Sequence, residues 1–96
     1  MSDRIKSRPL VLVCLAKRSQ GTPSDLVDQL QCAGALVYVT HGWEGCVRAA
    51  TALVPTAIYL DPRLTRRVMP YLRAHPNSTF ADIAEVHAGG EIHRVR

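Results

Sequence analysis

Acidic residues are scarce in this chain and unevenly spread. Its 96 residues contain 8 aspartates and glutamates against 12 lysines and arginines, and no acid lies between Arg4 and Ser24. Metal centres and paired-carboxylate catalysis need several acidic side chains in one place. We therefore expect no metal, no cofactor and no enzymatic activity. The net charge of +4 permits an acidic partner without identifying one.

Cysteines are also few, and they lack the spacing of a disulfide framework or a zinc site. Cys14, Cys32 and Cys46 are odd in number and form no C-x-x-C motif, which argues for reduced thiols in a cytoplasmic protein. We expect all three to fill apolar positions as small hydrophobic residues. His87 and His93 flank a glycine-rich turn, but no third ligand accompanies them.

Long hydrophobic runs are absent. The apolar run at residues 10–16 follows a basic segment and imitates part of a secretion signal, but the KRSQG sequence after it is unlike a cleavage site. No stretch approaches the ~20 apolar residues of a membrane span. With 47% hydrophobic and 21% charged residues and no internal repeat, the chain is predicted to be one globular domain, 1–96, with residues 1–8 a flexible basic terminus.

Strands and helices alternate along the first two thirds of the sequence. Residues 10–15 form a β-branched apolar run typical of a buried parallel strand, and a Thr-Pro-Ser-Asp start at 22–25 predicts a helix that ends at Gly34. Residues 35–40 and 56–60 predict two more strands, with a helix at 43–53 between them. This order is typical of parallel βαβ units.

The last third predicts a helix and a hairpin. Residues 63–75 are amphipathic, but Pro70 means either that a short turn precedes a helix starting at 69–70, or that one helix bends there. Segments 79–87 and 91–95 flank Ala88-Gly89-Gly90 and predict a β-hairpin. A two-residue turn would place Glu85 opposite Arg94.

We therefore predict an α/β protein with three layers and a mostly parallel sheet, in the order βαβαβα followed by a C-terminal β-hairpin. Three helices leave part of the sheet uncovered, and a second copy is the usual way to cover such a surface. The sequence thus also predicts a homodimer.

Residues 33–64 resemble the middle of a receiver domain, the CheY-like module of bacterial two-component signalling. The resemblance consists of a helix ending in Ala33-Gly34, the HGWEG turn at 41–45, and Asp61 after a third strand. It implies a flavodoxin-like fold with Asp61 at the phosphoacceptor position. The family's acidic pair after the first strand is replaced by Leu15, Ala16, Lys17 and Arg18, and its fourth helix, fifth strand and lysine have no counterpart. The resemblance is therefore to a degenerate, truncated receiver in which Asp61 is a vestigial phosphoacceptor.

Two groups of basic residues are candidate binding sites. The loop after the first strand leads into a helix amino terminus, where α/β folds bind anions. Its candidate ligand-binding residues, with one from the next crossover, are Lys17, Arg18, Ser19, Thr22 and His41. Lys17 or Arg18 is also a candidate ionic partner for Asp61. A second group forms the candidate partner-binding residues, namely Trp43, Arg63, Arg66, Arg67 and Arg73.

The leading hypothesis is a non-catalytic, phosphorylation-independent protein-interaction module in bacterial signalling or regulation. The alternative is a small basic protein that binds nucleic acid, a nucleotide or another anion at the strand-end loop. The arginine group lacks interleaved aromatic residues, which weakens the nucleic-acid reading. No membrane association is expected.

Overall fold

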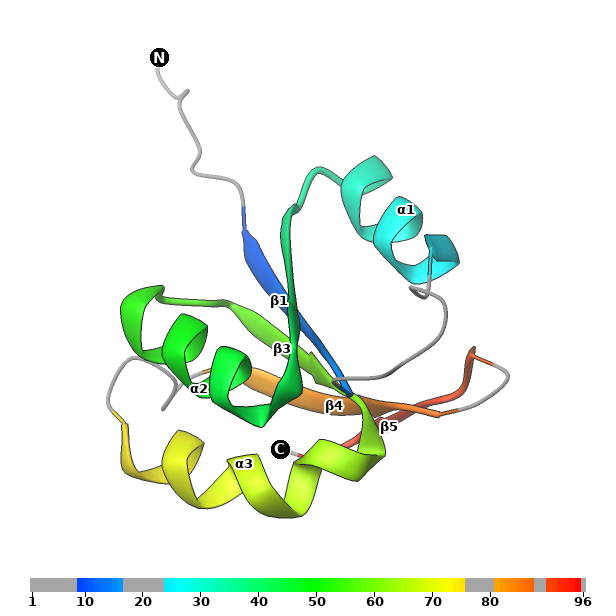
Figure 1. Cartoon of the computed structure of the whole chain (residues 1–96). Helices are drawn as coiled ribbons and strands as arrows, with labels where there is room; N and C mark the ends of the chain where they lie inside the picture. The colour runs from blue at the N-terminus through cyan, green and yellow to red at the C-terminus, as the bar shows by residue number, and fades with distance from the viewer. Residues whose placement is uncertain (1–8, 17–23, 76–80, 88–89, 96) are drawn as a thin grey trace.

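The computed structural model of the protein describes residues 9–16, 24–75, 81–87 and 90–95. The predicted flexible terminus, residues 1–8, lies outside the described residues. Three helices and a mixed five-stranded sheet make up the described part of the chain (Figure 1). The α/β class is therefore confirmed.

The sheet has the strand order β2-β1-β3-β4-β5. Its strands are β1 (Leu10–Leu15), β2 (Leu36–His41), β3 (Ala57–Leu60), β4 (Asp82–Val86) and β5 (Ile92–Arg94). The first four strands run parallel, and β5 pairs antiparallel with β4. The predicted strands and the hairpin are confirmed, each with shifts of a few residues at its ends.

The helices are α1 (Ser24–Cys32), α2 (Gly42–Ala52) and α3 (Pro62–Ala74). Figure 1 shows α1 on one side of the sheet and α2 and α3 on the other. The physical reason is the right-handedness of parallel crossovers. From β1 to β2 the chain moves across the sheet in one direction, and from β2 through β3 to β4 it moves in the other. Right-handed crossovers that run in opposite directions place their helices on opposite faces of the sheet.

The hydrophobic core lies on both faces of β1, which has a parallel strand on each side. Leu12 and Cys14 point into the larger cluster beneath α2 and α3, whereas Val11, Val13 and Leu15 point toward the α1 side. All five side chains are buried. A strand covered on both faces needs a continuous apolar sequence, which explains why residues 10–15 show no alternation.

Two helix features follow from single residues. Gly34 adopts a positive φ of 94°, and this left-handed residue ends α1 as predicted. Pro70 lies inside α3, which is one helix over Pro62–Ala74, so the alternative of a turn before a helix at 69–70 is wrong. The ring of Pro70 is exposed, so the helix continues with its proline on the outer side.

The β4–β5 hairpin has a longer turn than two residues. The His87 N–H donates to the Glu91 carbonyl at 2.7 Å, which leaves three residues between them. Glu85 consequently lies opposite His93, and the predicted pairing of Glu85 with Arg94 is wrong. Arg94 lies opposite Ala84 and forms an ion pair with Asp82 at 3.0 Å.

No helix in the described part of the chain is long and apolar enough to cross a membrane.

A candidate binding groove along α3

Asp61 is the amino-terminal cap of α3. Its Oδ1 accepts a hydrogen bond from the Arg63 backbone N–H at 2.9 Å and another from Arg63 Nε at 3.0 Å. Its Oδ2 accepts from Arg63 Nη2 at 2.7 Å. Pro62 occupies the first helical turn, where a missing N–H costs nothing. The Asp-Pro-Arg sequence thus builds a local cap that fixes where α3 starts.

These contacts also determine the charge of Asp61. The Arg63 side chain, with smaller contributions from the Arg63 and Ala16 backbone, holds the pKa of the Asp61 carboxyl below its usual value, although partial burial acts in the opposite direction. The Asp61 side chain is only 11% exposed. Both carboxylate oxygens are therefore engaged in holding the helix start. A phosphoacceptor needs a free oxygen and a neighbouring metal site.

The strand-end loop proposed as an anion site falls largely outside the described residues, since Lys17, Arg18, Ser19 and Thr22 are not among them. His41 is described. It ends β2 and precedes α2, is exposed, and its side chain does not cap the helix. Among described residues, the ionic partner of Asp61 is Arg63.

Trp43, Arg67 and Tyr71 form a stack between α2 and α3. The Arg67 guanidinium carbon lies 4.5 Å from the centre of the Trp43 ring. The Tyr71 ring stacks on the same tryptophan with centroids 5.8 Å apart. Trp43 is partly buried against the core, while 49% of Tyr71 is exposed. The stack presents aromatic and cationic surface to solvent on the outside of the two helices.

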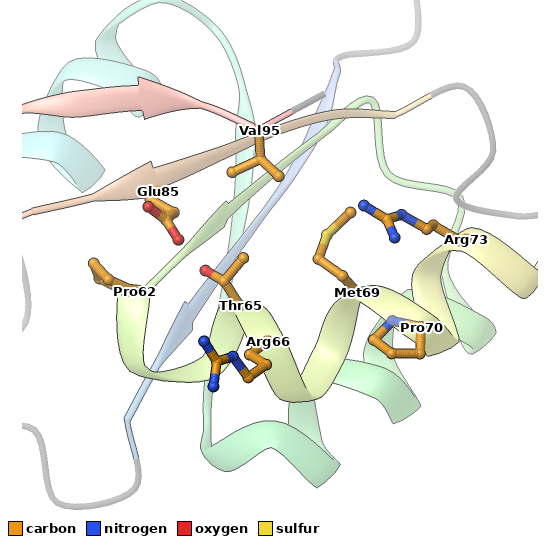
Figure 2. A pocket seen from close by; sticks show the side chains of 8 residues that line it. All are labelled: Pro62, Thr65, Arg66, Met69, Pro70, Arg73, Glu85 and Val95. Atoms are coloured by element: carbon orange, nitrogen blue, oxygen red, sulfur yellow. The ribbon is translucent and has the colours of Figure 1, made fainter.

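A groove of about 480 Å³ runs along the other side of α3. Figure 2 shows Thr65 and Met69 extending from α3 toward the strands, with Val95 pointing down between them and Glu85 at the β4 side. Pro62, Arg66, Pro70 and Arg73 complete the lining. The α3 residues recur at helical spacing, so they form one stripe along nearly the full length of the helix.

The charges of this groove are separated. Glu85 lies on the strand side. The pKa of its carboxyl is held below the usual value mainly by the Thr65 hydroxyl, and to a smaller extent by the nearby His87 and His93. His87 Nε2 lies 2.9 Å from Glu85 Oε1. Arg66 and Arg73 lie on the helix side, are exposed, and form no ion pair with any described residue. The groove therefore has a negative strand wall and a positive helix rim.

The structure brings together some of the candidate residues and separates others. Trp43 and Arg67 meet in the stack, Arg66 and Arg73 line the groove, and Arg63 is bound to Asp61 instead. Sequence reasoning missed Tyr71, Thr65, Met69, Glu85 and Val95. For Tyr71 a signal existed, because it follows Arg67 by one helical turn. Glu85 and Val95 come from the hairpin, and no local pattern connects them to α3.

The three cysteines differ in their burial. Cys14 and Cys46 are buried thiols next to each other, and the hydrogen bond from Cys14, together with burial, raises the pKa of Cys46. Cys32 is exposed, so the prediction that it fills an apolar position is wrong. Its position in the last turn of α1 faces solvent rather than the sheet. Within the described ranges, no three His, Cys, Asp or Glu side chains are arranged to hold a metal ion.

No family model, curated protein or solved structure matches this chain.

Proposed function

We propose that this chain is a non-catalytic, phosphorylation-independent module of receiver-like architecture that binds an acidic segment of a protein partner along α3. The observation that carries the proposal is the α3 surface itself. Arginines without ion pairs among the described residues lie on both sides of α3: Arg66 and Arg73 line the groove, and Arg67 lies on the aromatic stack. Trp, Tyr and Arg are the residue types that dominate binding energy at protein interfaces.

Charge complementarity selects the class of partner. Helix α3 contains four arginines and no acidic residue over Pro62–Ala74, and only Arg63 among the four is neutralised, by Asp61. Guanidinium groups suit carboxylates because their planar fork matches both oxygens. An acidic segment therefore gains ion pairs on α3 that no described residue of this chain supplies.

The groove also constrains the spacing of the partner's acids. Arg66 and Arg73 are seven residues apart on the helix, an axial separation of about 10 Å. A partner segment in the polyproline II conformation rises about 3.1 Å per residue and directs every third side chain to the same side, so two side chains three positions apart span about 9 Å. We therefore propose that the partner segment carries two carboxylates about three positions apart. An apolar side chain between them contacts Met69 and Val95. Glu85 keeps a further carboxylate away from the strand wall.

The receiver-like part of the proposal is supported by the strand order and by the helices on both faces of the sheet, which agree with a flavodoxin-like winding. Phosphorylation-independence is supported by the Asp61 cap. A role in bacterial signalling or regulation, in the cytoplasm, belongs to the same proposal. The exposed free thiol of Cys32 supports a reducing compartment.

The experiment is an isothermal titration calorimetry measurement, which detects peptide binding without a label. Tryptophan fluorescence is unsuited to it, because Trp43 lies in α2 and stacks on the side of α3 away from the groove. The probe is a synthetic peptide with two aspartates three positions apart around a leucine, and its control carries asparagines instead. We expect saturable binding of the acidic peptide alone, weakening as salt is added.

Variants locate the site. Replacing Arg66→Glu together with Arg73→Glu should weaken peptide binding by tenfold or more, about 1.4 kcal/mol. Arg48→Glu is the matched control, since Arg48 is exposed on α2 and contributes to neither the groove nor the stack. Equal effects of Arg48→Glu and the double variant would refute the site. Tighter binding of a single-stranded oligothymidine than of the peptide would instead favour the nucleic-acid alternative.

A further inference from the structure

Strand β2 is an edge of the described sheet, and it lacks the features that normally protect an edge. Its six residues, Leu36–His41, include no lysine, arginine, acid or proline. Natural proteins shield free edges with charges, prolines or short strands. The opposite edge, β5, follows that rule, because it has only three residues and carries Arg94 in an ion pair with Asp82.

The outer main-chain groups of β2 can be assigned from its pairing with β1. The Leu36 N–H donates to the Pro9 carbonyl at 2.9 Å, so Leu36, Tyr38 and Thr40 direct their main-chain groups toward β1. Val37 and Val39 therefore direct theirs away from the sheet. Among the described residues, nothing bonds to these outward groups.

Two large apolar side chains accompany this edge. Leu36 is 48% exposed and Tyr38 is 52% exposed, and both point to the same face of the sheet because they are two residues apart. Such side chains are costly to leave in water, and together with the unpaired main chain they mark a surface suited to strand addition.

We infer that β2 pairs antiparallel with β2 of a second copy of this chain, about a two-fold axis at Tyr38, so that two sheets become one. In this register Val37 of each copy lies opposite Val39 of the other, and each such pair exchanges two main-chain hydrogen bonds. Tyr38 lies opposite its own equivalent, and Leu36 lies opposite Thr40.

The edge is self-complementary, because the outward main-chain groups belong to Val37 and Val39, which lie symmetrically about Tyr38, and this argues for a second copy as the occupant. Charge points the same way. Each chain carries a net charge of +4, yet β2 contains no lysine, arginine, aspartate or glutamate, so two copies meet there without like charges in direct contact. The inference is independent of the proposed function, because β2 contributes no residue to the α3 groove or the stack.

Light scattering across a concentration series gives the first test. We expect the mass to rise to twice 10.6 kDa and the Tyr38→Lys variant to remain at 10.6 kDa. Ile92→Lys is the matched control, since Ile92 is 48% exposed on the opposite edge, and it should still dimerise. A wild-type mass of 10.6 kDa at every concentration refutes the inference. So does loss of dimer in Ile92→Lys but not in Tyr38→Lys.

A cross-linking test does not depend on how well a lysine variant folds. In a Cys32→Ser background, Tyr38→Cys places two thiols on residues directly opposite each other, with Cα atoms about 4.5 Å apart, which suits a disulfide. We expect mild oxidation to give a covalent dimer with Tyr38→Cys at least about tenfold faster than with Ile92→Cys. Equal rates would indicate random collision and overturn the assigned interface.

Discussion

Replacement of Asp61 by alanine tests whether this residue is a structural cap. The variant removes the acceptor for the Arg63 backbone N–H and the negative charge at the positive end of the α3 dipole. Loss of an N-cap costs about 0.5–2 kcal/mol, and the dipole contribution lies within about 0.3–1 kcal/mol. The Arg63 side chain is 68% exposed, so its ion pair with Asp61 adds little to this loss. We expect a loss of about 1–2 kcal/mol, or several degrees in Tm.

Asp61→Asn is the matched control, because asparagine keeps the acceptor and loses only the charge. It should cost a few tenths of a kcal/mol. The assay is urea unfolding followed by circular dichroism, with the slope against urea unchanged between variants. The penalty of Asp61→Ala should also depend on pH. The folded pKa of Asp61 lies below its ordinary value of 3.8, so the stabilisation from Asp61 is complete above that value and is lost as pH falls through the lowered pKa.

Two results would refute this reasoning. One is an Asp61→Ala variant as stable as the wild type at neutral pH, which would mean that the cap contributes nothing. The other is an adduct of about 80 Da after incubation with acetyl phosphate and Mg²⁺ that is absent from Asp61→Asn. That adduct would show Asp61 to be a working phosphoacceptor despite its contacts with Arg63.

Four further outcomes are expected. Leu72→Ala should cost about 2–5 kcal/mol in urea unfolding, because Leu72 is 1% exposed on the core-facing side of α3. A loss below that range would mean that the site collapses around the smaller side chain. Pro70→Ala should stabilise the protein by about 1–2 kcal/mol. Alanine restores an N–H within α3, and this gain is partly offset because the unfolded chain becomes more flexible. An unchanged Tm would contradict this expectation. Glu85→Gln should flatten the acid side of the curve of stability against pH. The lowered pKa of Glu85 gives stability above its ordinary value of 4.5 that is lost as pH falls through the folded pKa, and parallel curves for the two proteins would count against this. Iodoacetamide should modify Cys32 rapidly in the native protein and Cys14 and Cys46 only after denaturation, as counted by intact mass.

The local features of α3 could be predicted from the sequence, but the neighbours of its exposed side chains could not. The amphipathic pattern predicted a helix over residues 63–75, and the structure places it at Pro62–Ala74. The pattern also separated buried Val68 from exposed Arg67. However, helical spacing says nothing about which neighbouring element each exposed arginine faces. Arg66 and Arg67 are adjacent in sequence, yet one borders the groove and the other lies on Trp43.

The hairpin illustrates the same limit. Glycines at 89 and 90 indicated a turn, but a change of one residue in turn length shifts the register and exchanges every cross-strand partner. The observed register places Val95 beside Ile83, and therefore on the same face of the sheet as Glu85, where both line the groove. The strand wall of the groove therefore depends on a detail that the sequence pattern left open.

The sequence by itself determined the order and type of the elements, the buried first strand, the end of α1 at Gly34 and the absence of acids from α3. These properties depend on each segment's own periodicity and on residues with few allowed conformations. The tertiary structure alone decided that Arg66, Arg73, Glu85 and Val95 surround one groove, that Arg67 and Tyr71 meet Trp43, and that β2 is an edge strand of the described sheet. Such relations arise when distant segments pack together, and the energy that fixes them is spread over many contacts between those segments.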